Sequence, residues 1–351
     1  MFRDAIEQMA PYTPGEQPRA GQRLIKLNTN ENPYPPSPLV RRAIVKAADT
    51  SLRLYPPPRA DQFIVAAARL YAIPREMILA GNGSDELLAM LFRATLGAGD
   101  KVAYALPTYS LYDTLAAIQE AQVCPVPLQP GFAQPLEALA AEGAALTIVC
   151  NPNSPCGTLA EPDRLEQLAR ALNGRLLAID EAYVDFADRD ALALLKRNPN
   201  VLVLRSLSKS FSLAGMRLGL CFAQPAIVEH LLKVKDSYNL SRLAIATGAA
   251  ALGDAAWMRR NAERVKRTRA MAITRLRQMG FEVPPSQANF VLVPGADGLR
   301  HALAVHGVLV RDCASFGLPG HVRIAVPAEP GLARLERALA ASFAPSGRWA
   351  R

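Results

Sequence analysis

The sequence predicts an α/β protein whose core is a mostly parallel β-sheet covered by helices on both faces. Two observations indicate this fold class. Short apolar segments alternate with stretches of helical periodicity from about residue 77 to residue 223, as they do in parallel sheets with crossover helices. In addition, 50% of the 351 residues are hydrophobic, which is enough for one or two substantial cores.

Six strands are expected in this alternating region, at residues 77–81, 101–106, 145–150, 175–180, 201–205 and 217–223. Helices are expected between them, at about residues 85–97, 110–120, 162–173 and 190–196. Ligands of open α/β sheets bind beyond the carboxyl ends of the strands, so the residues that follow these strands are the candidates for a site.

The N-terminal flank has a different character. Residues 28–38, NTNENPYPPSP, contain too much proline and asparagine for a central strand or a helix interior. We therefore expect the first 35 residues to form an irregular arm that lies over another part of the protein. Two helical patterns follow, at 39–49 and 60–72, and a proline cluster that begins at Tyr55 separates them.

The C-terminal flank begins with a long helical region, at about 225–279, with a turn at Gly253-Asp254. Beyond it, strands and helices mix in the pattern of a small α+β domain, with strands at 289–293, 307–311 and 321–326 and helices at 298–305 and 329–343. The expected division is an arm (1–35), a large domain (36–265) and a small C-terminal domain (266–351).

Composition excludes several classes of protein. A charged fraction of 20% and a mean hydropathy of +0.07 exclude a disordered chain. No apolar run approaches the roughly 20 residues that cross a bilayer. The N-terminus lacks the apolar segment of a secretory signal. A cytoplasmic protein without membrane contact is therefore expected.

Charge and cysteine content indicate which kinds of molecule the protein binds. Forty basic and 31 acidic side chains leave a net charge of +9. The arginines are scattered, however, and their densest group, within residues 259–269, is typical of the solvated face of a helix. We therefore expect anionic metabolites rather than nucleic acid as partners. The five cysteines form no CxxC pair, so no metal site and no disulfide framework is predicted.

A phosphate cradle is predicted after the first strand of the alternating region. There the sequence reads Gly81-Asn-Gly-Ser84-Asp85, in which the glycines permit a tight turn and Ser84 can cap the next helix. A helix N-terminus offers free N–H groups to an anion. The spacing is not GxGxxG, which disfavours a dinucleotide. The alternative is an ordinary capped turn.

Polar side chains also follow the next three strands. Tyr109 can stack on a flat ring, or it can simply pack on its own helix. Asn153 and Ser154 lie in a proline-stiffened loop, for which a plain Asx turn is the alternative. Asp180 ends the apolar segment LLAI, where an unpaired buried carboxylate is costly. It therefore needs a cationic partner, unless it is a helix N-cap.

The last of these strands leads into a segment of serines around one lysine. Ser206, Ser208 and Lys209 come together, and Arg217 follows eight residues later. Neighbouring positive charge and partial desolvation lower the pKa of a lysine, which imine chemistry requires. Taken alone, a surface lysine in a serine-rich loop is the alternative interpretation.

All these groups together match the needs of pyridoxal phosphate (PLP). This cofactor requires a lysine that forms an imine, an acid that keeps the pyridine nitrogen protonated, donors to the ring hydroxyl and ligands for the phosphate. Tyr183, just beyond Asp180, adds a phenolic hydroxyl. The sequence therefore predicts a PLP enzyme.

These motifs resemble those of the fold-type I PLP-dependent aminotransferases, and most closely the histidinol-phosphate aminotransferase branch. The resemblance covers nearly the whole chain, through LNTNENPYPPSP, GNGSDELL, PTYSLY, NPNSPCGT, DEAYVDF, RSLSKSFSLAGMRLG, KVKDSYNLS, NFVLV and VRIAV. It implies a fold-type I PLP transferase, with a mostly parallel seven-stranded sheet, helices on both faces and a small α+β C-terminal domain.

The resemblance also implies a role for individual residues. Lys209 corresponds to the imine lysine and proton shuttle, Asp180 to the partner of the pyridine nitrogen, and Tyr183 to the donor to the ring oxygen. Tyr109 corresponds to the stacking aromatic residue. The phosphate ligands correspond to Ser84, Asp85, Ser206, Ser208 and Arg217.

Further roles concern the substrate and a second subunit. Tyr55 corresponds to a tyrosine that reaches the phosphate in the neighbouring subunit, which implies a homodimer with shared active sites. Arg323 corresponds to the arginine that holds the substrate carboxylate. Without the resemblance, it would be a lone arginine on a strand of the small domain.

One loop departs from the family pattern. The usual loop reads NPNNPTG, and the second asparagine of its NN pair contacts the ring hydroxyl. This chain has Ser154 at that position and Cys156 in place of the threonine. Either Ser154 supplies a shorter donor or Asn153 takes over the contact.

The resemblance implies amino transfer from L-histidinol phosphate to 2-oxoglutarate, which yields imidazole acetol phosphate and glutamate. Arg311 is a second candidate for binding anionic groups, unless it pairs with Asp312. Asn32 can line the pocket, although an Asx turn is the alternative. Tyr238 and Asn239 can contact substrate or belong to a plain loop.

The same scaffold allows other substrates, above all in an aromatic amino acid aminotransferase and also in a phosphothreonine decarboxylase. Two more distant alternatives are a cofactor-binding regulator built on a transferase fold and a nucleotide-binding α/β protein without imine chemistry.

Overall fold

The computed structural model describes residues 1–10, 16–18, 24–295 and 298–342. The larger of its two sheets has seven strands in the order β2-β8-β7-β6-β5-β3-β4. Strand β8 runs antiparallel to both of its neighbours, and the other pairs are parallel. The strands are β2 (Ile78–Gly81), β3 (Lys101–Leu106), β4 (Gln122–Pro127), β5 (Leu146–Cys150), β6 (Leu176–Asp180), β7 (Val201–Ser206) and β8 (Gly219–Ala223).

The sequence predicts six of these strands and misses β4. Its sequence QVCPVP contains two prolines, which argue against a strand with partners on both sides. β4 lies at the edge of the sheet and pairs only with β3. Proline is tolerated there because one side of the strand needs no ladder hydrogen bonds.

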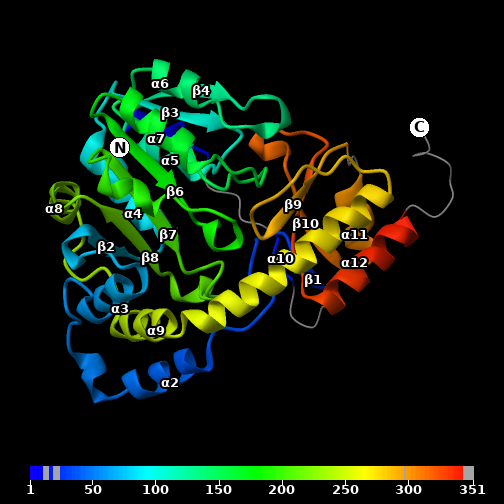
Figure 1. The fold of residues 1–351 in the computed structure, drawn as a ribbon, viewed down its shortest axis with the longest axis horizontal. Helices are drawn as coiled ribbons and strands as arrows, with labels where there is room; N and C mark the ends of the chain where they lie inside the picture. Colours follow the sequence, from blue (N-terminus) through cyan, green and yellow to red (C-terminus); the bar gives the residue numbers. More distant parts are fainter. Residues whose placement is uncertain (11–15, 19–23, 296–297, 343–351) are drawn as a thin grey trace.

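Helices cover both faces of this sheet, as predicted (Figure 1). Alternate residues of a strand point to opposite faces, and in β2 Ile78 and Leu79 accordingly belong to two separate hydrophobic cores. The first core is completed by α2 (Pro38–Ala47), α3 (Asp61–Tyr71), α6 (Leu136–Ala141), α7 (Pro162–Ala171) and α9 (Arg242–Gly253). The second is completed by α4 (Ser84–Thr95), α5 (Leu111–Ile118) and α8 (Pro225–Lys233).

The helical region expected at 225–279 is also interrupted at 234–241, between α8 and α9, and two further details of the helix predictions differ from the structure. Helix α6 has no counterpart among them, and the helix expected at 190–196 is a short 3₁₀ helix, η5 (Leu192–Lys196). The remaining short helices are α1 (Asp4–Glu7), η1 (Thr50–Arg53), η2 (Arg75–Met77), η3 (Pro130–Phe132), η4 (Val184–Phe186), η6 (Ala214–Met216) and η7 (Ala314–Phe316).

The C-terminal part forms a second sheet, of order β1-β10-β11-β9. Its elements are β9 (Phe290–Val293), β10 (Val308–Asp312), β11 (Val322–Ala325), α11 (Leu299–Val305) and α12 (Glu329–Ser342). The end of the helix expected at 329–343 and the C-terminal boundary at residue 351 lie outside the described residues. α10 (Ala255–Gln278) begins just after the predicted turn at Gly253-Asp254 and runs toward this sheet (Figure 1).

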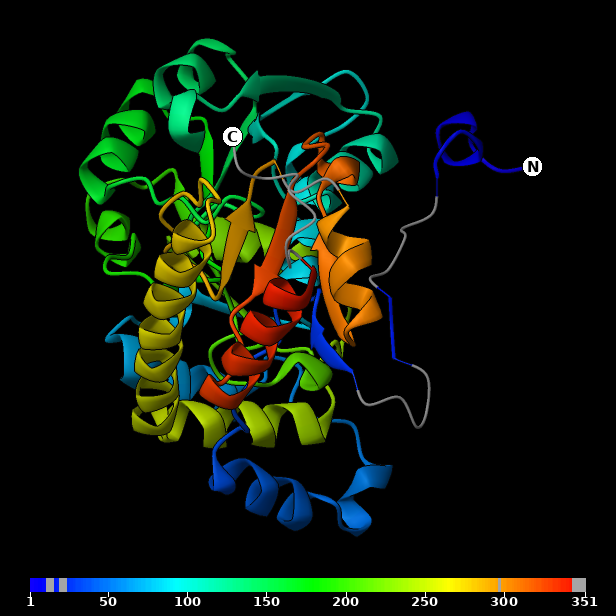
Figure 2. The ribbon, with the colours of Figure 1, turned by 90° about the vertical axis from the view of Figure 1, so that its right-hand side faces the viewer.

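The N-terminal arm contains a strand that the sequence does not predict. β1 (Ile25–Leu27) pairs in parallel with β10, and Figure 2 shows this blue strand beside the C-terminal elements. Three residues are too few for a periodicity to be recognised. Because β1 anchors the arm, the Asn-rich segment after it is held between the two sheets.

No helix of the described residues has the length and apolar character needed to span a membrane.

Candidate functional site

The predicted site residues gather at one edge of the large sheet. Asp180 at the end of β6 lies opposite Cys150 of β5. Gly219, where β8 begins, lies between Ser206 of β7 and Gly81 of β2. The loops that follow these strands therefore start side by side, as the parallel topology requires.

Asp180 is a buried carboxylate that is held by uncharged donors. Its side chain accepts hydrogen bonds from the hydroxyl of Tyr112 at 2.7 Å and from the N–H of Ala182 at 3.1 Å. Burial raises its pKa to about 6, and these hydrogen bonds only partly oppose that shift. Within the described residues no lysine, arginine or histidine forms an ion pair with it. A positively charged group bound next to this carboxylate would therefore stabilise its ionised form.

Lys209 lies under the N-terminal arm. Its Nζ donates a hydrogen bond to the carbonyl of Thr29 at 3.3 Å and lies 5.7 Å from the ring centroid of Tyr183. The hydroxyl of Tyr183 accepts a hydrogen bond from the amide of Asn30 at 3.1 Å. The arm therefore lies over the predicted imine lysine and the predicted ring-oxygen donor.

The predicted phosphate cradle is built by a close approach of two chain segments. A Cβ atom on Gly219 would lie 2.5–2.6 Å from backbone atoms of Gly83 and Ser84, so only glycine fits there. Gly83 has a positive φ of 84° and occupies the N-cap position. The prediction that Ser84 caps α4 is therefore wrong: Ser84 is the first residue of the helix, since glycine alone readily adopts the backbone conformation that the turn needs.

Charged and hydroxyl groups surround this helix start. Arg217 Nη2 forms an ion pair with Asp85 at 2.8 Å. Ser206 and Ser208 are buried, and the Ser206 hydroxyl accepts the N–H of Ser208 at 3.2 Å. The structure thus brings together all five residues that the sequence proposes as phosphate ligands, with the helix N–H groups among them.

Tyr109 lies beside the cradle. Its hydroxyl donates to Asp85 at 3.2 Å, and its ring meets the ring of Tyr112 edge-on at a centroid distance of 5.8 Å. Burial raises the pKa of Tyr109 well above its usual value, and the nearby charges of Asp85, Tyr183 and Asp180 act in the same direction. Tyr109 is therefore a neutral aromatic ring close to the Asp180 carboxylate.

The loop after β5 connects the site to the second sheet. The Oγ of Ser154 accepts a hydrogen bond from Arg323 at 2.9 Å. The amide of Asn153 is engaged by the backbone: it donates to the carbonyl of Pro107 and accepts from the N–H of Cys156, both at 3.1 Å. Both side chains are buried and already engaged, so which of the two contacts the ring hydroxyl stays a prediction.

Arg323 is held by aromatic rings. Its guanidinium lies 5.3 Å from the ring centroid of Phe290 and 5.7 Å from that of Phe316. Arg311 lies directly opposite it on β10 and also faces Phe316, at 5.6 Å. Within the described residues Arg311 forms no ion pair with Asp312, which instead caps the next turn. Two guanidinium groups are thus available at neighbouring positions of one sheet.

Asn32 uses its side chain to hold the backbone. Its amide donates to the carbonyls of Lys209 and Ser210 at 2.9 and 3.1 Å, and its Oδ1 accepts from the N–H of Tyr34 at 3.0 Å. This is the predicted alternative, an Asx turn, combined with a clamp on the lysine loop. A substrate contact by Asn32 stays a prediction.

Tyr55 is apart from the other predicted ligands. It is 78% exposed, and within the described residues its ring stacks on Tyr238, with a centroid distance of 4.5 Å. Tyr238 also lies on the surface, which disfavours a contact between it and a substrate bound at Lys209 of the same chain.

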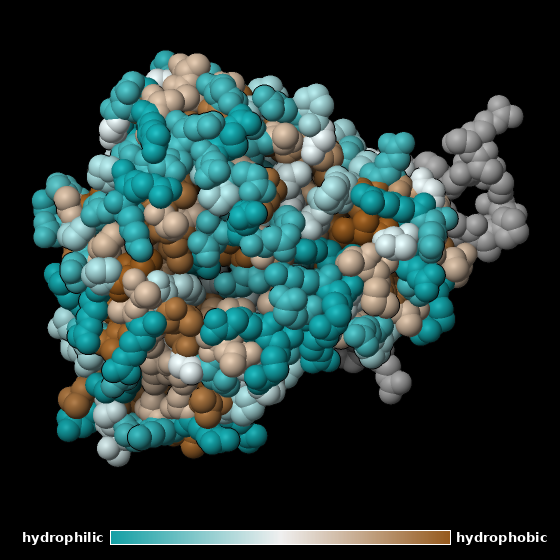
Figure 3. All heavy atoms as spheres, viewed as in Figure 1, coloured by the Kyte–Doolittle hydropathy of each residue, from teal (hydrophilic) through white to brown (hydrophobic). Residues whose placement is uncertain are grey.

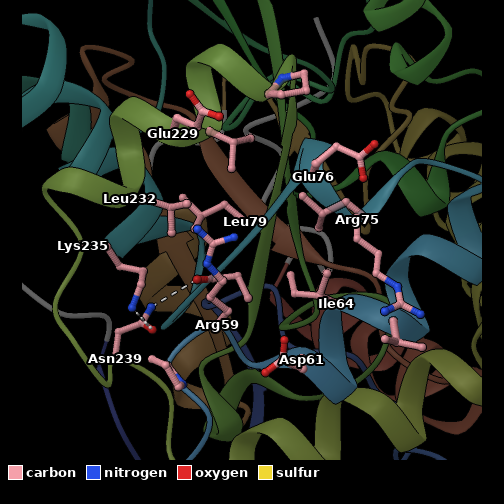
Figure 4. A pocket seen from close by; sticks show the side chains of 16 residues that line it. Arg59, Asp61, Ile64, Arg75, Glu76, Leu79, Glu229, Leu232, Lys235 and Asn239 are labelled. Atoms are coloured by element: carbon pink, nitrogen blue, oxygen red, sulfur yellow. Dashed lines mark hydrogen bonds between the residues drawn. The ribbon is translucent and has the colours of Figure 1, made fainter.

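A pocket of about 370 Å³ lies outside the site, along the free edge of β2 (Figure 4). Arg59, Glu229, Lys235 and Asn239 are among its lining residues. It contains neither Lys209 nor any other predicted cofactor ligand.

Asn239 links this pocket to the cradle. Its amide donates to the carbonyl of Ala80 at 3.1 Å and to Glu86 at 2.7 Å, and Glu86 accepts the N–H of Asn82 at 2.6 Å. The sequence offers Asn239 as a candidate for substrate contact, whereas in the structure it supports the loop that precedes α4.

Some residues of the site are not found by sequence reasoning. Tyr112, which binds Asp180, lies within the PTYSLY motif, but nothing marks it as distinct from Tyr109. Asn30, which binds Tyr183, belongs to the arm, and the side chain of Asn289 donates to its carbonyl at 2.9 Å. The arm's run of asparagines was the available signal, since such side chains satisfy buried polar groups.

The model of the family "Aminotransferase class I and II" matches residues 22–341. The chain belongs to this family. Histidinol-phosphate aminotransferase 1 of Trichormus variabilis is 41% identical to this aminotransferase over 342 residues, 96% of this chain and 97% of that protein. Histidinol-phosphate aminotransferase of Citrifermentans bemidjiense is 42% identical over 342 residues, again 96% and 97%.

The solved structures agree with this assignment. The crystal structure of histidinol-phosphate aminotransferase from Sinorhizobium meliloti in complex with pyridoxal-5'-phosphate matches with a TM-score of 0.88 and 28% identity, and the match covers 97% of each chain. The predicted fold class and the resemblance to aminotransferases are thereby confirmed.

Proposed function

We propose that this aminotransferase uses PLP to transfer the amino group of L-histidinol phosphate to 2-oxoglutarate. The cofactor assignment rests on the Asp180 carboxylate, which is 3% exposed and has no cationic partner among the described residues. A protonated pyridine ring would supply the missing charge. The substrate assignment is supported by the names of relatives that match nearly the full chain.

The residues present fit the cofactor. Lys209 would hold its aldehyde carbon, the helix start at Ser84 its phosphate, and Tyr109 one face of its ring. When bound, PLP supplies an electron-withdrawing ring that stabilises negative charge on the substrate carbon. Asp180 would hold the ring nitrogen in its protonated form, since its carboxylate favours a positive charge beside it.

The protein's own groups move the protons and orient the substrate. Lys209 would be the group that accepts the α-proton of the substrate at its Nζ and gives it back. The hydroxyl of Tyr183 would donate a hydrogen bond to the ring oxygen. Arg323 binds the carboxylate of 2-oxoglutarate as a two-pronged donor, and Arg311 opposite it suits the phosphate of the other substrate.

The active protein is proposed to be a cytoplasmic homodimer. The support for the dimer is Tyr55, whose exposed ring is separate from the other cofactor ligands of its own chain. The expected partners are small anionic substrates and a second copy of the chain.

A substrate panel tests this function. Steady-state turnover is measured with histidinol phosphate, phenylalanine and phosphothreonine. We expect kcat/KM for histidinol phosphate to exceed that for phenylalanine by about 100-fold or more. Phenylalanine has no phosphate, so the groups that bind the substrate phosphate would be left without a partner. A preference for phenylalanine, or release of CO₂ from phosphothreonine, would contradict the assignment.

A lysine variant tests the cofactor. Purified protein reconstituted with PLP should show the visible absorbance of an imine, and Lys209→Ala should abolish it. Lys196→Ala is the matched control, because Lys196 is exposed at the end of η5. Retention of the absorbance in Lys209→Ala would disprove the role of that lysine.

A further inference from the structure

A buried arginine lies behind the site and contacts three carboxylates. Arg205, in β7, is 5% exposed. Its Nε lies 2.8 Å from Glu181, and its two terminal nitrogens lie 3.3 Å from Asp185 and from Asp190. The guanidinium also lies 5.5 Å from the ring centroid of Tyr71. None of these residues is among the predicted cofactor or substrate ligands.

One residue of this cluster, Glu181, is next in sequence to Asp180, the proposed partner of the pyridine nitrogen. Besides its contact with Arg205, Glu181 accepts the N–H of Ala191 at 2.6 Å, and its own N–H donates to the carbonyl of Leu204 at 2.9 Å. The backbone that carries Asp180 is therefore anchored to β7 through a fully buried side chain.

The cluster also contacts the loop that carries Lys209. Asp185 accepts a hydrogen bond from the hydroxyl of Ser210, which directly follows Lys209. Ser210 is 2% exposed. From the opposite side, Asn32 donates to the carbonyls of both Lys209 and Ser210. Asp185 thus holds the lysine loop by the side chain of Ser210, and Asn32 of the arm holds the same loop by its backbone carbonyls.

We propose that Arg205 and Asp185 are positioning residues that set the distance between the Lys209 amine and the Asp180 carboxylate across the cofactor ring. This inference rests on two contacts of the Arg205 cluster. Glu181, next to Asp180 in the chain, contacts Arg205 itself, and Ser210, next to Lys209, binds Asp185. The inference also rests on the proposed function, because it concerns the two groups that would act on opposite ends of the ring.

Fold stability alone gives a weaker account of the cluster. A buried ion pair is often no more stabilising than apolar residues of the same volume. A fixed geometry, by contrast, is what proton transfer requires, since a displacement of about 1 Å in a reacting group costs roughly 100-fold in rate.

The test compares variants that cut the link to Lys209 with one that does not. Ser210→Ala and Asp185→Asn remove the connection to the lysine loop. Asp190→Asn is the matched control, because Asp190 contacts the same arginine but is half exposed and does not contact the lysine loop. All are compared with wild type as PLP-loaded, full-length protein, and their melting temperatures are recorded.

The first readout is the pH midpoint of the visible absorbance of the loaded protein, which needs no substrate. We expect Ser210→Ala and Asp185→Asn to shift this midpoint by about 0.5 unit or more, since the lysine nitrogen changes its position relative to the ring. The second readout is kcat, which should fall by about 10- to 100-fold in the same two variants. Asp190→Asn should leave both close to wild type.

Two results would overturn the proposal. One is a wild-type midpoint and kcat in both Ser210→Ala and Asp185→Asn. The other is the same change in Asp190→Asn as in these two, which would indicate a general loss of stability. Failure of the proposed substrate would look different, since wild type would then keep its absorbance titration but show no turnover with histidinol phosphate.

Discussion

At the level of single residues, the charge state of Asp180 links the stability of the protein to its cofactor. Burial is the main reason why its pKa is raised from the ordinary value of 3.8 to about 6. A raised carboxyl pKa means that the folded protein holds the proton more tightly than the unfolded chain does. This contribution to stability is therefore fully present below about pH 4 and is lost as the pH rises through 6.

The variant Asp180→Asn should stabilise the cofactor-free protein at pH 8. The difference in pKa corresponds to about 3 kcal/mol that the buried negative charge costs there, so the melting temperature should rise by several degrees. At pH 4 the difference should be small. With PLP bound, the same variant should lose roughly 1000-fold in kcat, because nothing keeps the ring nitrogen protonated.

Asp113→Asn is the control for that measurement. Asp113 also accepts a hydrogen bond from a buried tyrosine, Tyr104, but its side chain is exposed. It should show no gain at pH 8. Destabilisation of cofactor-free Asp180→Asn at pH 8 would refute the argument.

Ser154 is the residue at which this chain departs most visibly from the aminotransferase pattern. Its Oγ accepts a hydrogen bond from Arg323 at 2.9 Å, and Arg323 Nη2 donates more weakly, at 3.5 Å, to the carbonyl of Asn28. The serine therefore helps to orient the arginine that is proposed to bind the substrate carboxylate.

The variant Ser154→Ala should raise KM for 2-oxoglutarate by about tenfold, since a hydrogen bond to a charged group contributes about 1.5–3 kcal/mol and water replaces part of it. kcat should change less, because the carboxylate is bound in the ground state as well as in the transition state. Steady-state kinetics with varied 2-oxoglutarate measure both. An unchanged KM with a reduced kcat would instead place Ser154 at the cofactor ring.

At the level of elements, the cradle depends on how closely β8 approaches the start of α4. Gly219 lies in β8 where a side chain would meet backbone rather than a movable side chain. The loop that precedes α4 is also held from outside by Asn239 and Glu86. The helix start is thus fixed from two sides.

The variant Gly219→Ala should weaken PLP binding by about tenfold or more, because a methyl group forces β8 and α4 apart by a fraction of an ångström or more and overpacking costs about 1–3 kcal/mol. Equilibrium binding followed by absorbance measures this. Gly215→Ala is the control, since apart from its neighbours in the chain nothing lies within 4 Å of the Cβ that it would add. Equal affinities in the two variants would contradict the close-approach argument.

Much of the sheet and most of the site could be predicted at this level, because strand order in sequence and polar strand ends follow from local pattern. The residues Asp180, Lys209, Tyr183 and Arg217 all stand out as polar groups at the ends of apolar segments. The strands β1 and β4 could not be predicted in this way, because β1 has only three residues and β4 contains proline.

Contacts between distant segments were beyond such reasoning. Nothing in the local sequence shows that Asn30 binds Tyr183, 153 residues away, or that Ser154 binds Arg323, 169 residues away. The Arg205 cluster was missed for the same reason: its acidic residues follow β6, and the arginine lies inside an apolar strand. Side-chain pairing of this kind is set by tertiary packing and not by periodicity.

At the level of the whole molecule, α10 connects the two parts of the protein. Met258 and Val265 in its first half pack into a core of the large sheet, whereas Ala272 and Leu276 belong to the core of the small one. We propose that the boundary between the large and small domains lies within this helix, near residues 265 and 266. The arm joins the small sheet through β1 and then crosses the site, so it contacts both domains.

The surface around α2 and Tyr55 supports the proposed homodimer. The apolar side chains Leu39, Val45, Leu52 and Leu54 are between 39% and 68% exposed. Figure 3 shows hydrophobic residues among hydrophilic ones in the lower part of the view, where α2 lies. Such residues near an exposed aromatic pair are suited to burial against a second copy of the chain.

A mixed dimer of two defective subunits tests whether sites are shared. One subunit carries Lys209→Ala and the other Tyr55→Ala, and two different affinity tags allow the mixed dimer to be isolated. If Tyr55 serves the partner's site, one site of the mixed dimer lacks both groups and the other contains both. Turnover with histidinol phosphate should then reach about half the wild-type value per dimer, although each parent dimer is impaired, because a two-fold symmetric dimer exchanges the same residue in both directions. If Tyr55 instead acted within its own chain, the mixed dimer would hold one dead and one weakened site, and its activity would not exceed that of the Tyr55→Ala parent.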